Sequence, residues 1–459
     1  MKKYDHIIVG TGQATGTLLG KLIPLGDSIA VIEGAKVGGS CVNYGCTPTK
    51  TMVAAAKAIH TARRGAFFGF TTDKVVVDYA RVRERMNEVR SASNEGLTEW
   101  LEGADNVDLI RAWGVFTGAK TLQVGEQEIE GEKIYINVGT QPFYPPIEGI
   151  QEVNALDSAG LLEVEDLPEH LLIIGGGYIG VEFAQVFRRL GSAVTIVQGG
   201  HQLMPREDTD VATAIQDFLE EEGIRIWLNS RATKVTENGK EIKLWVEQEG
   251  MKATLTGSHL LIATGRRPNS DRLHLEAAGI KTDERGYIQV DNYCRTNVEN
   301  VFALGDVNGE GAFTHTSVND AEIVLDFLFG GKRKISMRNT IYGLFTDPPL
   351  GRVGMNEKEA IASGKKVLKS VYPMSEISRA KEMGETKGFA KLLVDADNDL
   401  ILGASILGAN GDEIVNMFAA IIHSNIPCNS YRKVVLIHPT ISELMPFVLD
   451  RLELVEVES

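Results

Sequence analysis

Apolar runs of strand length alternate with glycine turns and helical stretches through much of the chain. The first run, YDHIIVG (residues 4–10), leads into a glycine turn, a helical stretch and a second apolar run that ends before Glu33. Continuous apolar runs of this length are typical of buried strands, and glycine marks the turn between a strand and a helix. The pattern predicts a strand–turn–helix–strand unit over residues 4–33.

The same pattern returns in LLIIGGGYIGVEFAQVFRRLGSAVTIVQGG, residues 171–200. Bare glycines let a backbone approach a pyrophosphate at a helix N-terminus, and an acidic residue after the second strand accepts from the adenosine ribose. One such turn is weak evidence because similar turns bind nothing, but two units predict two nucleotides, one in each of two domains. The glycines are Gly10, Gly12 and Gly16 in the first turn and Gly175, Gly177 and Gly180 in the second.

Later segments complete this organisation. INVGTQPFYPPIEG (residues 136–149) and LLIATGRRPNS (residues 260–270) each pass from a strand through a glycine to proline, which is typical of a domain boundary. NVFALGDV (residues 300–307) adds a strand with Asp306 near its carboxyl end, where open α/β sheets bind ligands. From about Ile335 the β-rich texture predicts a further domain with an antiparallel sheet.

Composition excludes several classes of function. The chain has 459 residues and a net charge of −15, which argues against nucleic acid as a partner because phosphates demand a basic face. There is no run of about 18 apolar residues to span a membrane. A strand-like run begins at Tyr4, where a signal peptide would stand. We therefore expect a cytoplasmic protein without a membrane partner.

GGSCVNYGCTPTK, residues 38–50, holds two of the four cysteines, Cys41 and Cys46. This pair is a structural bridge, a metal clip or a redox couple. Four scattered cysteines are too few for a disulfide scaffold, and zinc needs four ligands. Cys294 and Cys428 stand alone and no histidine pair accompanies them, so we expect no metal site. In a reducing compartment the remaining interpretations are catalysis or redox sensing.

Five segments occur in order at wide spacing: GGSCVNYGCTPTK, GGGYIGVEFA, ATGRRPN, ALGDV and HPTISE. Together they resemble the pyridine nucleotide–disulfide oxidoreductases, which include lipoamide dehydrogenase, glutathione reductase and mercuric reductase. The resemblance covers essentially the whole chain. GCTPTKTMVAAA and MPREDTDVATAI are most similar to the mercuric-reductase-like and reactive-chlorine-resistance flavoproteins.

The resemblance implies an α/β fold with two Rossmann-like nucleotide-binding domains and a C-terminal α+β dimerisation domain with an antiparallel sheet. It also implies FAD, a nicotinamide nucleotide and a homodimer whose subunits share each active site. The expected segments are 1–146 (first part of the FAD domain), 147–268 (NAD(P) domain), 269–335 (return to the FAD domain) and 336–459 (dimerisation domain).

The family architecture also assigns roles to individual residues. Cys46 is expected beside the flavin, and Cys41 is expected to exchange with the substrate. Lys50 is expected near the reactive flavin nitrogen, paired with Glu182. His438 and Glu443, from HPTISE, would serve the partner subunit's cysteines as an acid–base pair. Tyr178 is either a lid over the flavin or a packed tyrosine in a tight turn.

The resemblance implies a set of cofactor-binding positions. They are Gly10, Gly12, Gly16, Glu33, Gly39, Lys50, Gly114, Thr140, Gly175, Gly177, Tyr178, Gly180, Gln198, Gly265, Asp306, Ala312 and His315.

Four departures from the family pattern bear on the substrates. Tyr44 replaces a small aliphatic residue between the cysteines, and Glu322 stands where glutathione reductases carry an arginine, which argues against glutathione. The C-terminal LELVEVES lacks the vicinal cysteines that mercuric reductases use. At Gln198, NAD-binding units usually carry a carboxylate, whose absence favours NADPH over NADH; His201 follows, but no arginine is expected there.

Three functions follow from these observations. The first is an FAD-dependent NAD(P)H:disulfide oxidoreductase acting through Cys41 and Cys46 on a disulfide. The second uses the same thiols to reduce Hg(II), Cu(II) or a quinone-like oxidant. The third is a redox sensor or a subunit of a lipoyl-carrier complex.

Overall fold

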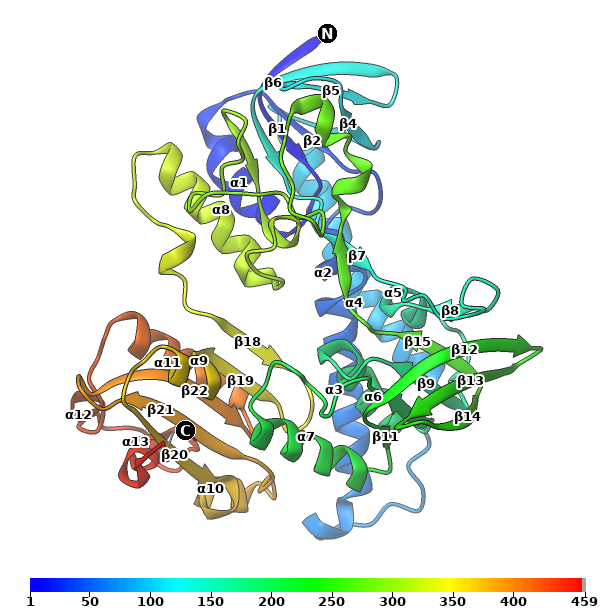
Figure 1. Ribbon diagram of the computed structural model, residues 1–459, viewed down its shortest axis with the longest axis vertical. Coiled ribbons are helices and arrows are strands. Elements are labelled where there is room, and N and C mark those ends of the chain that lie inside the picture. Colours follow the sequence, from blue (N-terminus) through cyan, green and yellow to red (C-terminus); the bar gives the residue numbers. More distant parts are fainter. Residues whose placement is uncertain (456–459) are drawn as a thin grey trace.

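The first glycine turn belongs to a seven-stranded sheet at the top of Figure 1, in the computed structural model, which describes residues 1–455. β1 pairs in parallel with β2 and with β6. β17 returns from far along the chain and also pairs in parallel with β6. The strands are β1 (Lys2–Val9), β2 (Ile29–Ile32), β3 (Val107–Ile110), β4 (Gly114–Phe116), β5 (Thr121–Val124), β6 (Gln127–Ile136) and β17 (Val301–Ala303).

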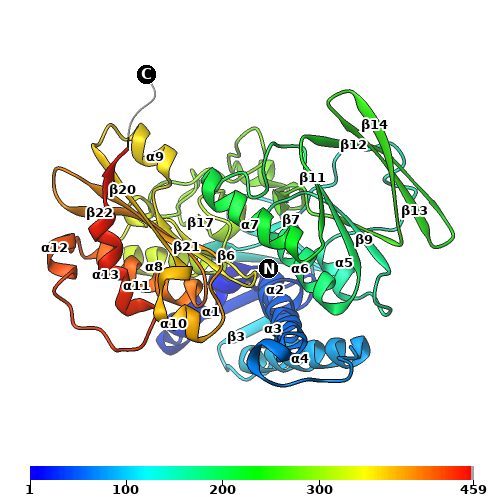
Figure 2. The same ribbon diagram turned by 90° about the horizontal axis from the view of Figure 1, so that it is seen from below.

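Two helices, α1 (Gln13–Leu22) and α8 (Thr314–Leu328), pack side by side against this sheet (Figure 1). A short helix, α2 (Gly39–Asn43), follows β2. Two long helices, α3 (Cys46–Arg63) and α4 (Tyr79–Glu102), pack together and extend from the sheet towards the second nucleotide domain (Figures 1 and 2). α3 therefore carries the cysteine motif from one domain towards the next.

The second glycine turn belongs to a five-stranded parallel sheet, ordered β11-β10-β9-β15-β8. A three-stranded antiparallel sheet lies beside it, and the antiparallel pair β7 and β16 joins the two nucleotide domains. The elements are β7 (Thr140–Pro142), β8 (Ala155–Leu156), α5 (Ser158–Leu162), β9 (His170–Ile174), α6 (Tyr178–Leu190), β10 (Ala193–Val197), α7 (Thr209–Glu221), β11 (Arg225–Trp227), β12 (Ser230–Asn238), β13 (Glu241–Gln248), β14 (Met251–Gly257), β15 (His259–Ile262) and β16 (Arg266–Pro268).

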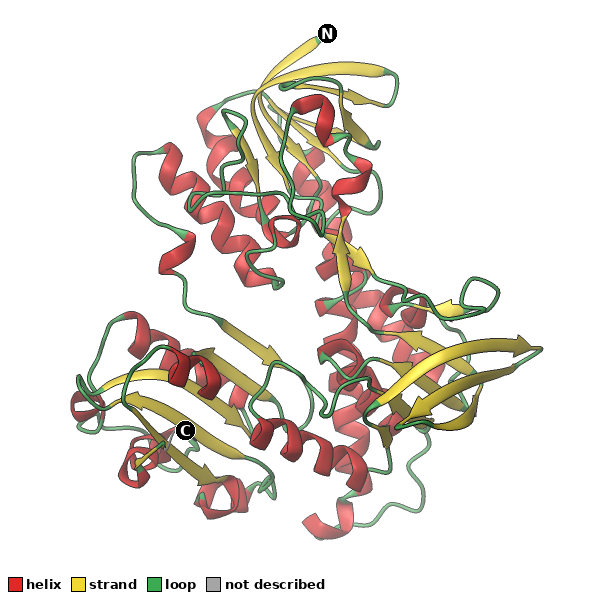
Figure 3. Cartoon of the chain, viewed as in Figure 1, coloured by secondary structure: helices red, strands yellow, loops and turns green. Residues whose placement is uncertain are grey.

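The C-terminal part is a six-stranded antiparallel sheet with helices packed on it, on the opposite side of the molecule from the second nucleotide domain (Figures 2 and 3). The elements are β18 (Ile341–Leu344), β19 (Leu350–Gly354), α9 (Glu357–Ala362), β20 (Val367–Pro373), α10 (Ser378–Glu382), β21 (Phe389–Asp395), β22 (Leu400–Leu407), α11 (Gly411–His423), α12 (Cys428–Tyr431), α13 (Met445–Val448) and β23 (Glu453–Leu454).

This architecture matches the predicted fold class: two units with parallel strands and a C-terminal antiparallel unit. Successive side chains of a strand point to opposite faces of its sheet. One face of the C-terminal sheet packs on α11 through buried Val353, Ala404 and Ile406. Residues 456–459 lie outside the described residues. They are the end of the predicted segment 336–459 and of the C-terminal sequence LELVEVES. In the described part, none of the helices is long and apolar enough to cross a membrane.

Candidate active site

A cavity of about 1600 Å³ opens where the three domains meet. Both glycine turns, the two cysteines of the CVNYGC motif and part of β18 line it. Most of the predicted cofactor-binding residues line this single cavity; among the predicted residues, the exceptions are Gly16, Gly180, His438 and Glu443.

Each nucleotide unit has a glycine that no other residue can replace without moving backbone. Gly10 has φ +95°, and a Cβ there would lie 2.4 Å from the Asn137 carbonyl oxygen. Gly175 has φ +111°, and its Cβ would lie 2.3 Å from the Ala263 carbonyl oxygen. Both turns thus press against the next strand of their sheet and leave the N-termini of α1 and α6 bare, as a pyrophosphate requires.

The third glycines differ between the two units. A Cβ on Gly180 would lie 2.1 Å from the Gly175 oxygen, so the close helix–turn contact requires glycine. A Cβ on Gly16 would meet no atom within 4 Å. In the first unit Thr15 stands where the tighter spacing has its third glycine, and its hydroxyl donates to the Gly10 oxygen at 2.8 Å. Gly16 therefore lies in α1 without forming part of the cavity wall.

The residue after the second strand plays the same structural part in both units. Glu33 is buried, and its Oε2 accepts from the backbone N–H of Thr11 at 3.0 Å. Gln198 Oε1 accepts from the backbone N–H of Gly176 at 3.0 Å. Each side chain thus reaches back to the middle residue of its own glycine turn, but only Glu33 brings a negative charge.

The two cysteines lie in adjoining helices. Cys41 is in α2 and Cys46 is the first residue of α3, and both are free thiols. A hydrogen bond between the two thiols lowers the pKa of Cys46 to about 6, helped by the Thr314 hydroxyl and the Lys50 ammonium. The same hydrogen bond, together with burial, raises the pKa of Cys41 above its ordinary range. At neutral pH the pair therefore holds one thiolate, on Cys46, and one proton, on Cys41.

Lys50 and Glu182 form the expected ion pair. Lys50 Nζ donates to Glu182 Oε2 at 2.8 Å, one helical turn after Cys46. Glu182 Oε1 accepts from the backbone N–H of Phe345, and the Lys50 ammonium lies 4.6 Å from the centroid of the Phe345 ring. Glu182 is buried, so the pair holds a cation at the cavity wall next to the cysteines.

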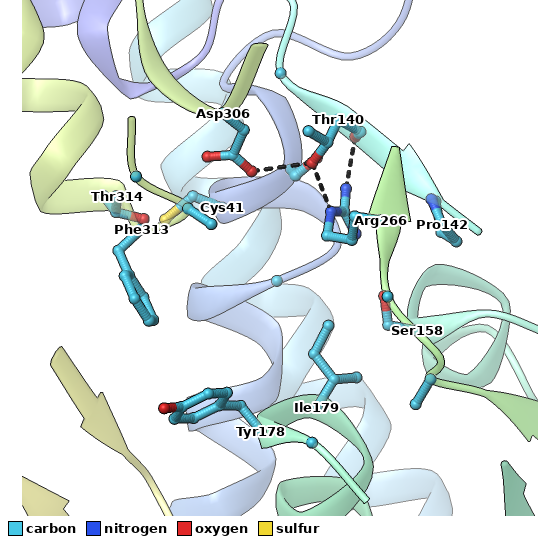
Figure 4. A pocket seen from close by; sticks show the side chains of 18 of the residues that line it. Cys41, Thr140, Pro142, Ser158, Tyr178, Ile179, Arg266, Asp306, Phe313 and Thr314 are labelled. Carbon is cyan, nitrogen blue, oxygen red and sulfur yellow. Dashed lines mark hydrogen bonds between the residues drawn. The ribbon is translucent and has the colours of Figure 1, made fainter. Parts of the chain in front are cut away.

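A polar chain crosses the upper wall of the cavity (Figure 4). The Thr140 hydroxyl donates to Asp306 Oδ2 at 3.0 Å and accepts from Arg266 Nε at 2.7 Å. Burial raises the pKa of Asp306 and lowers the pKa of Arg266. Sequence reasoning selected Thr140 and Asp306 but missed Arg266, although it lies in the ATGRRPN motif directly after the selected Gly265.

The remaining selected positions lie around the same wall. Gly39 packs on Gly12, since its Cβ would lie 3.1 Å from the Gly12 Cα. His315 is near the start of α8 and its Nε2 contacts the Ile341 oxygen at 2.6 Å, while burial lowers its pKa. The others are Gly114 at the start of β4, Gly265 before β16 and Ala312 before α8.

His438 and Glu443 stand apart from the cavity. His438 Nδ1 lies 2.9 Å from Glu443 Oε1, and the histidine side chain is 77% exposed. The segment before it is also exposed: Val435 keeps 96% of its surface and Ile437 keeps 78%. Within this one chain the histidine therefore does not face Cys41.

The comparisons with known proteins bear on this arrangement. A family model described as pyridine nucleotide-disulphide oxidoreductase matches residues 4–321, and the dimerisation domain of the same family matches residues 341–447. The chain belongs to this family. The probable pyridine nucleotide-disulfide oxidoreductase RclA of Escherichia coli is 38% identical over 96% of this chain and 98% of its own length.

Other members of this family are similar as well. A mercuric reductase from Staphylococcus aureus is 34% identical over 90% of this chain and 76% of its own length. A dihydrolipoyl dehydrogenase from Bacillus subtilis is 28% identical over 96% of this chain and 94% of its own. A solved Cu(II) complex of the HOCl-induced flavoprotein disulfide reductase RclA superposes with a TM-score of 0.90 and 37% identity, over 98% of this chain and 99% of that chain.

Like its family, the chain is a flavin-dependent NAD(P)H–disulfide oxidoreductase, and its cavity fits the two cofactors. Gly10 and Gly175 keep each turn clear of side chains at a bare helix N-terminus, which is the requirement of a bound pyrophosphate. Within residues 1–455, no three His, Cys, Asp or Glu side chains gather into a metal site.

Two arginines that sequence reasoning did not select line the cavity. Sequence reasoning expected no arginine near Gln198, yet Arg206 and Arg231 line the same cavity. The backbone N–H of Ser230 donates to the Gln198 oxygen at 3.0 Å, which places Arg231 beside that position. Arg231 lies far along the chain at the start of β12, where no local signal pointed to it.

Proposed function

We propose that Cys41 exchanges with a disulfide substrate while Cys46 stays next to the flavin. The pKa split of the pair carries this proposal: Cys46, with a pKa of about 6, is the thiolate, and Cys41 keeps its proton. Cys41 therefore needs a base before it can attack, because only a thiolate is nucleophilic.

The thiol–disulfide exchange takes place in two steps. A base takes the Cys41 proton, and the Cys41 thiolate attacks one substrate sulfur. The substrate S–S bond breaks, and the departing sulfur receives that proton as a thiol. The Cys46 thiolate then attacks Cys41 in the mixed disulfide, which forms the Cys41–Cys46 bond and releases the second sulfur to take a proton from water. Two electrons pass from the cysteine pair to the substrate.

Several groups of this chain support the cofactor roles. The chemistry that bound FAD would supply is acceptance of a hydride from NAD(P)H and return of two electrons to the cysteine pair. Gly10, Gly12 and Glu33 would hold its adenosine and pyrophosphate, and Asp306 its ribityl chain. Lys50, fixed by Glu182, places a positive charge beside the cysteine pair.

The base is proposed to be His438 of a second copy of this chain. Glu443 orients its imidazole and leaves Nε2 available for proton transfer. His438 is exposed in the single chain, and it follows the exposed apolar residues Val434, Val435 and Ile437. A surface of this kind fits the interface of a homodimer, and the segment lies within the matched dimerisation domain.

The nicotinamide nucleotide is proposed to be NADPH, with NADH as the alternative. Gln198 contributes no negative charge to repel a 2′-phosphate. Arg206 and Arg231, in the same cavity, supply guanidinium groups that suit a phosphate.

The four segments 1–146, 147–268, 269–335 and 336–459 are proposed as the domain units. The pairing of β17 with β6 supports the return to the first unit, and the β7–β16 pair supports the two crossings between units. A cytoplasmic location is proposed because a reversible cysteine couple works in a reducing compartment.

An acceptor assay tests the function. The purified protein is supplied with NADPH or NADH and, separately, with lipoamide, small disulfides, Cu(II) and Hg(II). We expect disulfide reduction that Cys41→Ser abolishes while FAD stays bound. Full turnover by Cys41→Ser with a disulfide would contradict the proposed thiol route.

Reduction of a thiophilic metal ion is the second candidate. Two free thiols, one of them a thiolate, line an open cavity, and thiolates bind Cu and Hg ions well. RclA has been solved as a Cu(II) complex, and several relatives are named mercuric reductases. In the same assay, NADPH oxidation that depends on Cu(II) or Hg(II) and on Cys41, without disulfide turnover, would favour this candidate.

A further inference from the structure

A buried carboxylate joins two tyrosines at the junction of the nucleotide and C-terminal domains. Glu207, just before α7, has a fully buried side chain. Its Oε1 accepts from the hydroxyl of Tyr178 at 2.9 Å and from the hydroxyl of Tyr342 at 2.7 Å. Tyr178 begins α6, and Tyr342 lies in β18 of the C-terminal sheet. One oxygen therefore connects two domains.

The other oxygen of this carboxylate lacks a hydrogen-bond donor in the described part of the chain. Glu207 Oε2 is buried and has no hydrogen-bond donor within residues 1–455. Arg352 Nη1, itself buried, lies 3.6 Å away, and it donates instead to Ser405 Oγ at 2.6 Å and to Asp208 Oδ2 at 3.4 Å. Glu207 therefore shares the Arg352 guanidinium with Asp208, and its own hydrogen bonds come from the two tyrosines. Burial raises the pKa of both tyrosines, which keeps them protonated as donors.

The Tyr178 ring, directly after the second glycine turn, contacts a residue next to the dithiol. It meets Phe313 edge-on, with centroids 6.1 Å apart, and Tyr342 edge-on at 5.5 Å. Phe313 precedes Thr314, whose hydroxyl lies 3.3 Å from Cys46 Sγ. Figure 4 shows the Tyr178 and Phe313 rings projecting into the same part of the cavity. Tyr178, Glu182 and Lys50 line the same cavity, so a nicotinamide that extends from the second glycine turn towards Lys50 would meet this ring.

We propose that Glu207 is a positioning residue that holds Tyr178 over the nicotinamide side of the cavity. The inference takes Tyr178 as a lid over the flavin, the first of the two roles that the family resemblance left open, and it rests on the proposed function. On this proposal the ring moves when the nicotinamide binds, and a hydrogen bond is lost once its donor and acceptor lie more than about 3.5 Å apart. Opening therefore breaks a charge-assisted bond inside the protein, and the strength of that bond sets how tightly the nicotinamide end binds.

We call the hydrogen bond from Tyr178 to Glu207 the latch. Tyr178→Phe tests the latch most directly because it keeps the ring and removes only the hydroxyl. We expect the holoenzyme variant to bind the oxidised nucleotide, NADP⁺ or NAD⁺, about 10-fold more tightly by calorimetry, since a hydrogen bond to a charged group no longer opposes opening. A fragment that lacks the nicotinamide serves as the control: adenosine 2′,5′-bisphosphate for NADP⁺ and ADP-ribose for NAD⁺. Its affinity should be the same in the variant and in the unaltered protein, because it does not reach the ring.

Glu207→Gln should have a similar but smaller effect, because a neutral amide accepts a weaker hydrogen bond. In the Tyr178→Phe background, Glu207→Gln should add nothing to nucleotide affinity, which a purely structural role would not predict. Glu222→Gln is the matched control: Glu222 pairs with buried Arg189 at 2.7 Å, outside this cavity, and should change stability only.

Quenching of flavin fluorescence by iodide provides a second readout. Tyr178→Ala should raise the quenching constant by exposing the flavin, and Glu207→Gln should raise it in part. No change with Tyr178→Ala would overturn both the lid and the latch, while bound FAD and thiol chemistry would still stand. A rise with Tyr178→Ala, with nucleotide affinity unchanged in Tyr178→Phe and Glu207→Gln, would overturn the latch alone.

Discussion

Gln198 accepts a hydrogen bond from the backbone N–H of Gly176 at 3.0 Å, so its side chain closes the second glycine turn from the strand end. Glu33 occupies the corresponding place in the first unit as a carboxylate. Gln198 thus holds the turn at the same position that is proposed to sense the adenosine ribose. The charge at this position can be changed without removing the hydrogen bond.

Gln198→Glu should shift nucleotide preference towards NADH. The carboxylate keeps an acceptor for Gly176, repels a 2′-phosphate and accepts from ribose hydroxyls. The measurement is the ratio of kcat/KM for NADH and NADPH, which we expect to rise by about 10-fold or more. An unchanged ratio, or a move towards NADPH, would show that this position does not sense the ribose.

Arg231→Ala should selectively weaken the binding of NADPH. A guanidinium–phosphate contact is charge-assisted, and its loss should raise the Kd for NADPH by about 10-fold while the Kd for NADH stays the same. Arg225→Ala, on the neighbouring β11, serves as a control because Arg225 does not line the cavity. An equal loss of affinity for both nucleotides would contradict a role in binding the phosphate.

The two thiols should titrate separately. In the reduced protein, alkylation of Cys46 by iodoacetamide should accelerate as pH rises through about 6, because the pKa of Cys46 is about 6 and only the thiolate reacts. Cys41 should alkylate more slowly up to pH 9, since its pKa is raised. Mass spectrometry of timed samples distinguishes the two sites.

Cys41→Ala should move the Cys46 transition to higher pH, because it removes the hydrogen bond from the Cys41 thiol, which is the largest cause of the lowered pKa. A Cys46 rate that first rises near pH 9 in the unaltered protein would contradict the pKa split.

Gly10→Ala should prevent FAD binding, whereas Gly16→Ala should be tolerated. At Gly10 the methyl group would lie 2.4 Å from a backbone oxygen at φ +95°, and at Gly16 it would meet nothing within 4 Å. The unaltered protein should purify yellow with one FAD per chain, which the absorbance spectrum measures. Both variants should be checked by circular dichroism. A colourless Gly16→Ala protein, or a fully loaded Gly10→Ala protein, would contradict this assignment.

His438→Ala should lower disulfide turnover by roughly 10²–10⁴-fold, the usual contribution of general acid–base catalysis. FAD content and electron transfer to a one-electron acceptor should survive, since neither needs a proton at Cys41. Glu443→Gln should have a smaller effect of the same kind, because Glu443 orients the imidazole without transferring the proton itself.

Mixed dimers test whether the site is shared. Protomers carrying Cys41→Ser and His438→Ala should form hybrids in which one site has both an intact cysteine pair and an intact histidine, so partial activity should return. Hybrid formation is measured separately with differently tagged protomers. Inactive hybrids would show that His438 does not serve the opposite subunit.

The features that the sequence determined by itself are local or strongly periodic. Two glycine turns between apolar strands and a late change to β-rich texture were sufficient to predict two nucleotide units and a C-terminal antiparallel sheet, and the spacing of the cysteines drew attention to Cys41 and Cys46. The pairing of Lys50 with Glu182 was expected only from the family resemblance. Positions of this kind are readable because backbone sterics and strand–helix periodicity act over a few residues.

Contacts between distant segments were decided only by the tertiary structure. Arg266 reaches Thr140, Arg231 lies beside Gln198, and Tyr342 meets Tyr178 through Glu207, in each case across more than 30 residues of chain. No periodicity links such residues, because their approach depends on how sheets and domains pack. The structure also separated Gly16 from Gly10, since packing against a neighbouring strand, rather than membership of a glycine-rich run, determines which glycine is indispensable.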